Sequence, residues 1–316
     1  MSFWIPFPTV STCCAAKAGI VPGHDPVITD EKEIRHRMWK KIMAAIMAGT
    51  LVFALAGCGT GQKETASGEK DKVHLTVFAA ASMTETMNQI AQEYEQEHPD
   101  VDISFNFDSS GTLKTQIQNG ADCDLFISAA QKQMNQLDGS RDKKANPDGL
   151  DYVKSDSRVD LLENKVVLVT PEENPGGIQN FNDMAAKLKE GSIRLVMGNS
   201  DVPVGQYTQK ILTFYGLDET AIARAGRITY GSNVKEVTTQ VREGSADCGV
   251  IYATDAFSAR LKPVDEATKD MCGQVIYPAA VMKHSQHQQE ARAFLDYLKG
   301  DGAMRIFKSV GFSPVS

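Results

Sequence analysis

The sequence predicts an α/β protein built around mainly parallel sheets and folded as one large domain or two smaller lobes. From Val73 onward, short apolar runs alternate with segments whose apolar residues recur at helical spacing, which is typical of strand and helix units in alternation. This part of the chain is long enough to bury a sizeable core. A weaker observation is a short internal similarity between two tetrapeptides, GADC at 120–123 and SADC at 245–248. Each of them precedes an apolar run.

Three strands are predicted in the first half of this region. They are the apolar run 73–79, the alternating segment 101–107 and the apolar run 125–128, which have the periods expected of strands. The first two flank a helix that ends before Pro99 and carries apolar residues at helical spacing, namely Met83, Met87, Ile90 and Tyr94. A second helix is expected from about Thr112 to Asn119.

Five further strands are predicted in the second half, separated by helical stretches. They are residues 166–169, 193–197, 228–230, 249–252 and 276–282. Two helices are expected to close the chain. The first has the stripe Ala291, Phe294, Leu295 and Leu298, and the second ends at Gly311.

The beginning of the chain predicts a targeting segment rather than part of the fold. Residues 42–56 are apolar or small, a length that is short for a membrane span but suits the core of a signal peptide. Lys40 and Lys41 precede this core and Leu55-Ala56-Gly57-Cys58 follows it, an order that resembles the bacterial lipoprotein signal. We therefore expect a signal peptide at 38–57, a lipid on Cys58 and a non-native upstream extension at 1–37. The alternative is a buried helix beginning at Trp39.

Residues 58–72 predict a flexible tether. They are rich in Gly, Ser, Thr, Lys and Glu and contain almost no apolar side chain, so they cannot bury enough surface to offset the entropy of ordering them. The buried-helix alternative leaves this polar segment unexplained, whereas a lipid anchor requires one of this kind.

The charge of the processed chain excludes one class of partner. After removal of residues 1–57 there remain 27 Lys and Arg against 36 Asp and Glu, a net charge of −9. No basic patch interleaved with aromatic residues is present, so nucleic acid is not an expected partner. An anionic ligand would meet an unfavourable overall field and would have to be held by local dipoles.

Four segments place small or hydroxyl residues where a predicted strand gives way to a helix. They are residues 79–82 (AAAS), 108–112 (DSSGT), 202–205 (VPVG) and 231–234 (GSNV). Because ligands of open α/β sheets bind beyond the carboxyl ends of the strands, all four segments are expected to meet at one cleft. Helix starts offer free backbone N–H groups and the positive end of the helix dipole, so this cleft suits an oxyanion.

Each segment also has a structural interpretation. Ser82 with Glu85 three residues later fits a capping box, and Ser109-Ser110-Gly111 alone would be a turn. Val204 and Val234 would be packing residues, and Tyr252 would be a half-buried core ring. Only the joint arrangement favours a binding site.

Several motifs resemble, in order, those of the molybdate-binding protein family of molybdate ABC importers. They are residues 76–82 (TVFAAAS), 109–113 (SSGTL), 121–129 (ADCDLFISA), 202–205 (VPVG), 249–256 (GVIYATDA) and 277–281 (YPAAV). The similarity runs from about Val73 to Phe312 and so covers nearly all of the processed chain.

This resemblance implies a periplasmic-binding-protein type II fold, with two α/β lobes that close on the ligand. Lobe 1 would be 73–165 plus 278–316 and lobe 2 would be 166–277, with hinges near 165–169 and 276–280. Molybdate or tungstate would be the ligand. The hydroxyls of Ser82, Ser110 and Tyr252 and the backbone N–H groups of Val204 and Val234 would donate to it. The resemblance also implies delivery of the ligand to an ABC permease and its ATPase. We further expect a monomer without a cofactor that lies outside the cell and is anchored to the cell membrane by the lipid on Cys58.

Three alternatives stay open. An enzyme would use Ser82, Ser110, Cys123 or Cys248 as its nucleophile, but no His stands in a recognisable relation to them and no nucleophile elbow is present. A metal protein would use His284, His287 and Cys272. A sulfate or phosphate carrier would share the fold and differ only in the anion. The pairing of Cys123, Cys248 and Cys272 is not readable from their spacing.

Overall fold

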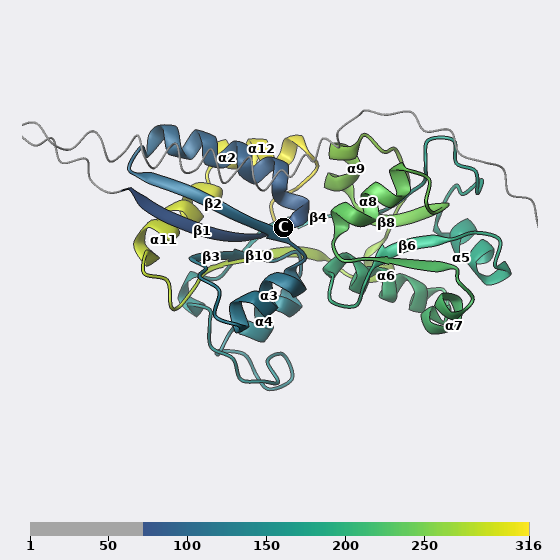
Figure 1. Ribbon diagram of the computed structural model, residues 1–316, viewed down its shortest axis with the longest axis horizontal. Helices are drawn as coiled ribbons and strands as arrows, with labels where there is room; N and C mark the ends of the chain where they lie inside the picture. The colour runs from purple at the N-terminus through teal and green to yellow at the C-terminus, as the bar shows by residue number, and fades with distance from the viewer. Residues whose placement is uncertain (1–71, 316) are drawn as a thin grey trace, which may run out of the picture. The chain divides into compact units, whose positions relative to one another are not determined.

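The computed structural model describes residues 72–315, which form two mixed sheets covered by helices (Figure 1). The predicted extension, signal peptide and Cys58, and all but the last residue of the tether, lie outside the described residues. Among residues 72–315, no helix is both long and apolar enough to span a membrane.

The first sheet has the strand order β2-β1-β3-β10-β4. Its strands are β1 (Val73–Ala80), β2 (Val101–Asp108), β3 (Leu125–Ile127), β4 (Val159–Asn164) and β10 (Val275–Val281). The associated helices are η1 (Ala81–Met83), α2 (Thr84–Glu97), α3 (Ser110–Gln118), α4 (Gln131–Leu137), η2 (Ser155–Ser157), α11 (Gln288–Leu298) and α12 (Asp301–Ser309). Helices α2, α11 and α12 pack together against one face of this sheet, and α3 and α4 cover the other (Figure 1).

The second sheet has the strand order β7-β6-β8-β5-β9. Its strands are β5 (Val166–Val169), β6 (Leu195–Gly198), β7 (Ile228–Gly231), β8 (Cys248–Tyr252) and β9 (Pro263–Glu266). The associated helices are α5 (Phe181–Glu190), α6 (Pro203–Phe214), α7 (Glu219–Arg224), α8 (Val234–Arg242), α9 (Ala253–Ala259) and α10 (Lys269–Cys272). Helices α6 and α8 both contact β6 and the central strand β8.

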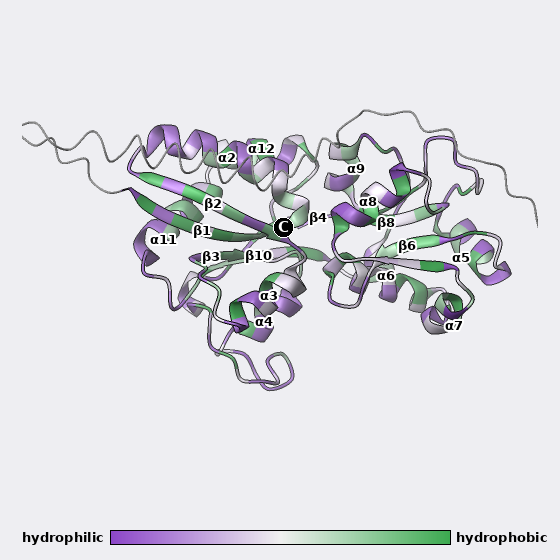
Figure 2. Ribbon diagram, viewed as in Figure 1, coloured by the Kyte–Doolittle hydropathy of each residue, from purple (hydrophilic) through white to green (hydrophobic). Residues whose placement is uncertain are grey.

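Alternation of side chains explains why each sheet needs helices on both faces. In β1, Val77 and Ala79 point into one apolar cluster, whereas Phe78 between them belongs to another that contains Leu113 and Ile117 of α3. The strands are hydrophobic over much of their length and the outward sides of helices are hydrophilic (Figure 2). Two-sided burial of this kind is typical of α/β folds.

The chain changes sheet twice, and these crossings make the prediction of mainly parallel sheets wrong. Strands β4 and β5 are separated only by Lys165 and belong to different sheets, and β10 returns the chain to the first sheet. The pairs β3–β10 and β10–β4 are antiparallel, as are β8–β5 and β5–β9. Strand β10 begins at Val275, three residues before the expected second segment of lobe 1 at 278.

Most predicted strands are confirmed, and 166–169 matches β5 at both ends. Strands β4 and β9 were not predicted. Their burial is incomplete, and charged residues such as Asp160, Glu163 and Asp265 interrupt the apolar pattern. A polar edge strand gives no apolar run to detect.

Candidate functional site

Ser82 lies between the end of β1 and the start of α2, inside the 3-10 turn η1, and it is buried. The capping-box interpretation is wrong. Helix α2 has Met83 at its N-cap and no side-chain cap, and the Ser82 hydroxyl is instead 2.8 Å from the hydroxyl of Tyr277. The carboxylate of Glu85 instead accepts a hydrogen bond from the ammonium group of Lys235 in α8. The Ser82 hydroxyl is therefore not occupied by the helix backbone.

Ser110 is the first residue of α3 and is fully buried. Its neighbour Ser109 is the N-cap, since the Ser109 hydroxyl accepts from the N–H of Thr112 at 3.1 Å. The Ser110 hydroxyl oxygen accepts the N–H of Ala129 at 2.9 Å. Because that bond uses an oxygen lone pair, the Ser110 proton remains free to donate.

Val204 and Val234 lie in the first turns of α6 and α8. Pro203 opens α6, and Asn233 caps α8 by accepting the N–H of Glu236 at 3.0 Å. First-turn N–H groups have no partner within their own helix, so these two main-chain donors are available to a ligand. Their apolar side chains are buried and anchor the helix starts.

Tyr252 ends β8, and its buried hydroxyl has no hydrogen-bond partner within residues 72–315. Burial, with further contributions from Tyr277, Tyr207 and Asp255, raises the pKa of Tyr252 well above its usual range. The hydroxyl therefore keeps its proton at neutral pH. A buried donor without a partner is costly unless a ligand accepts from it.

All five predicted residues line one small cavity of about 10 Å³. The full lining consists of Ala80, Ala81, Ser82, Asp108, Ser109, Ser110, Ala129, Val202, Pro203, Val204, Val234 and Tyr252. It contains no Lys or Arg, and its one carboxylate belongs to Asp108, which accepts the N–H of Ser109 at 2.6 Å. A ligand here would be held by hydroxyl and backbone N–H donors without a full countercharge.

Contacts around the cavity join the elements of the two sheets. Lys235 of α8 lies 2.8 Å from both carboxylate oxygens of Glu85 in α2, and 3.3 Å from the buried carboxylate of Asp255. Burial raises the pKa of Asp255 to about 6, and Lys235 partly opposes that rise. At Gly111 of α3, a Cβ would lie 2.2 Å from the carbonyl oxygen of Asp201. These contacts were not apparent from the sequence.

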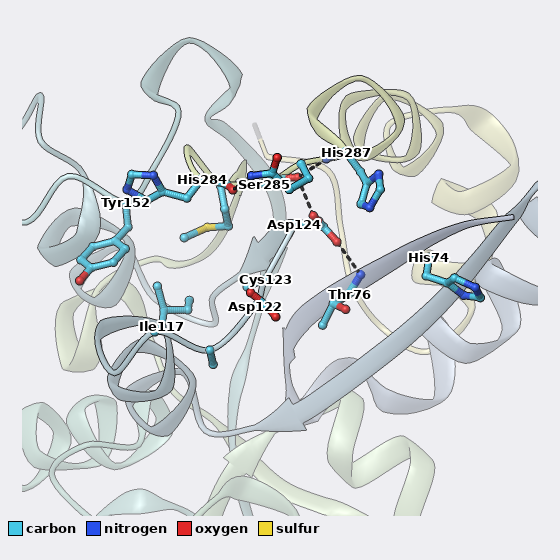
Figure 3. A pocket seen from close by; sticks show the side chains of 14 residues that line it. His74, Thr76, Ile117, Asp122, Cys123, Asp124, Tyr152, His284, Ser285 and His287 are labelled. Atoms are coloured by element: carbon cyan, nitrogen blue, oxygen red, sulfur yellow. Dashed lines mark hydrogen bonds between the residues drawn. The ribbon is translucent and has the colours of Figure 1, made fainter. Parts of the chain in front are cut away.

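A larger cavity of about 520 Å³ lies elsewhere on the first sheet, and it contains the histidines of the metal alternative (Figure 3). The ring of His284 faces Tyr152, whereas His287 lies on the far side of Ser285 (Figure 3). The carboxylate of Asp124 is already occupied by the N–H of Thr76 and the hydroxyl of Ser285. Within residues 72–315, no three His, Cys, Asp or Glu side chains are grouped to hold a metal ion.

The cysteines give no support to the enzyme alternative. Cys123, Cys248 and Cys272 are free and buried. Burial raises the pKa of all three thiols, which disfavours the nucleophilic thiolate. The hydrogen-bonded neighbours of Ser82 and Ser110 are Tyr277 and the N–H of Ala129, and neither can serve as a general base.

Known proteins resemble this chain over the region that forms the two sheets and the cavity. The bacterial extracellular solute-binding protein family matches residues 75–313. The candidate ABC transporter substrate-binding lipoprotein YvgL of Bacillus subtilis is 36% identical, over 87% of this chain and 99% of its own length. The molybdate-binding protein ModA of Escherichia coli is 33% identical, over 88% of this chain and 98% of its own.

A solved structure shows the same fold. The periplasmic molybdate-binding protein of Azotobacter vinelandii superposes with a TM-score of 0.64 at 22% identity, covering 77% of this chain and all of its own. The predicted two-lobe type II architecture is confirmed by this likeness together with the two sheets. The chain belongs to the family of bacterial extracellular solute-binding proteins.

Proposed function

We propose that this protein captures molybdate, and also tungstate, and delivers it to the permease and ATPase of an ABC importer. The observation that carries the proposal is the cavity in which Ser82, Ser110 and Tyr252 present hydroxyl protons beside the helix starts at Val204 and Val234. A tetrahedral dianion needs several donors at once, and each hydrogen bond to a charged acceptor contributes about 1.5–3 kcal/mol. The relative from Escherichia coli, named as a molybdate-binding protein, supports the choice of anion.

We also propose that Cys58 carries a lipid that holds the protein at the outer face of the cell membrane. The sequence around Cys58 supports this, as does the Bacillus subtilis relative, whose name describes a lipoprotein. Globomycin treatment of producing cells tests the anchor, because it blocks cleavage before a lipidated cysteine and should leave the longer precursor. Normal processing in its presence would contradict the anchor.

Thermal unfolding tests the ligand. Purified protein freed of bound anion should be melted with molybdate, tungstate, sulfate or phosphate added separately. A ligand that binds only the folded state stabilises it by about 2.7 kcal/mol at a hundredfold excess over Kd. We expect molybdate and tungstate to raise the melting temperature. A rise with sulfate or phosphate alone would assign another anion to the same site, and no rise with any of them would refute the proposal.

A further inference from the structure

A chain of hydrogen bonds connects Ser82 to three residues that do not line the cavity, Tyr277, Asn164 and Thr254. The hydroxyl of Ser82 is 2.8 Å from that of Tyr277, and the side-chain nitrogen of Asn164 lies 3.2 Å from the same Tyr277 oxygen. The Asn164 nitrogen also donates to the hydroxyl of Thr254 at 3.0 Å. Tyr277 and Asn164 are buried, so bulk water does not compete for these bonds.

The orientation of the Asn164 amide is set by the main chain. The backbone N–H of Lys165 donates to the side-chain oxygen Oδ1 of Asn164 at 2.8 Å. A backbone N–H can only donate, so the oxygen of the amide must face Lys165 and the NH2 group must face Tyr277 and Thr254.

This orientation gives the remaining bonds a direction. The NH2 group can only donate to the Tyr277 oxygen, and the Ser82 oxygen is the other hydrogen-bond partner of the Tyr277 hydroxyl among the described residues. The Tyr277 proton therefore has an acceptor only if Tyr277 donates to Ser82. Burial raises the pKa of Tyr277 well above its usual range, which keeps that proton in place. Ser82 accepts from Tyr277, and its own proton is left for the cavity that it lines.

We propose that Tyr277 and Asn164 are positioning residues that turn the Ser82 hydroxyl into an obligate donor toward the bound anion. The inference rests on the proposed function. It assigns Ser82 an oxyanion oxygen that carries no proton, because a protonated oxygen would offer a second donor where Ser82 needs an acceptor. Ser110 is held in the same sense by the N–H of Ala129.

The hydrogen-bonded chain Ser82–Tyr277–Asn164–Thr254, called the relay below, also lies where the polypeptide passes between the sheets. Asn164 ends β4 and is followed by the crossing residue Lys165, Tyr277 lies in the returning strand β10, and Thr254 lies in α9 just after Tyr252. The Ser82 proton is thus oriented by groups that belong to elements of both sheets. A change in their relative position would alter the donor that the anion meets.

A double-mutant cycle tests the relay. Molybdate affinity should be measured by calorimetry for the unmodified protein, Tyr277→Phe, Ser82→Ala and the double variant. Removing the Tyr277 hydroxyl frees the Ser82 proton to turn away, so we expect about a three- to tenfold loss of affinity in Tyr277→Phe. In the Ser82→Ala background the Tyr277→Phe change should alter affinity by less than about twofold, because the Ser82 hydroxyl that Tyr277 orients is then absent.

Two further variants separate this role from packing. Asn164→Ala removes the donor that directs Tyr277, and it should lower affinity only when Ser82 is present. Tyr94→Phe is the matched control, because Tyr94 is also a buried tyrosine but lies in α2, outside the cavity lining. It should leave affinity unchanged with and without Ser82. Equal losses from Tyr277→Phe with and without Ser82, or no loss in the presence of Ser82, would overturn the relay alone. An unmodified protein that binds no oxyanion would overturn the proposed function with it.

Discussion

Replacing Ser82 and Ser110 by Ala and Tyr252 by Phe in one chain should lower molybdate affinity by about a thousandfold or more. Each hydroxyl faces the same cavity, and the Ser110 and Tyr252 protons have no acceptor among the described residues. At the lower value of about 1.5 kcal/mol per bond, three bonds contribute about 4.5 kcal/mol, and each 1.4 kcal/mol is a factor of about ten. Isothermal titration calorimetry measures the change.

A triple variant with hydroxyls removed elsewhere serves as the control. The hydroxyls of Ser104 and Ser192 bond to backbone carbonyls, and Tyr94 is buried against aromatic neighbours in the first sheet's helices. Ser104→Ala, Ser192→Ala and Tyr94→Phe together should leave affinity as it is. If the cavity variant bound molybdate as tightly as this control, these hydroxyls would not be the ligand donors.

Gly111→Ala should lower affinity by roughly ten- to a hundredfold while leaving the ligand-free protein at least as stable. Its Cβ would lie 2.2 Å from the carbonyl oxygen of Asp201 and 2.9 Å from the carbonyl carbon. Gly111 is in α3 of the first sheet and Asp201 precedes α6 of the second, so the elements that carry Ser110 and Val204 would have to separate. Within α3 itself, Ala is a better helix former than Gly by up to about 1 kcal/mol.

Gly302→Ala is the matched control, because Gly302 is likewise the second residue of a helix and its Cβ would meet only the end of the Arg305 side chain, at 4.0 Å. It should leave affinity unchanged and, as in α3, leave stability unchanged or raise it by up to about 1 kcal/mol. Calorimetry of binding and thermal melting of the ligand-free proteins separate the two effects. A Gly111→Ala protein with a lower melting temperature but unchanged molybdate affinity would show that Gly111 is needed for folding and not for the approach of α3 to Asp201.

The strands and the site loops were largely predictable because both depend on local patterns. Alternation and apolar runs identify β1, β2 and β5, and the small residues after the strands identify the helix starts that line the cavity. Ser82 illustrates the limit. Its local pattern favoured a capping box, whereas its actual partner, Tyr277, is 195 residues away in the sequence and is brought to it by the packing of β10 into the first sheet.

Strand direction and contacts between the sheets were not predictable for the same reason. An apolar run such as β10 is equally compatible with either direction, and its antiparallel pairing follows from the route that the chain takes between the sheets. The ion pair between Glu85 and Lys235 joins residues 150 positions apart, and each of them alone has the pattern of a solvated helix surface. These features depend on tertiary structure, which no local window contains.

The most direct test of the central claim is to locate the anion itself. Crystals of the protein grown with molybdate should be measured just above the molybdenum absorption edge, where the metal gives an anomalous signal that protein atoms do not. We expect one strong anomalous peak in the cavity, within hydrogen-bonding distance of the Ser82, Ser110 and Tyr252 hydroxyls and the Val204 and Val234 N–H groups. A peak at another place, or a cavity without a peak in crystals of protein shown to bind molybdate, would contradict the account.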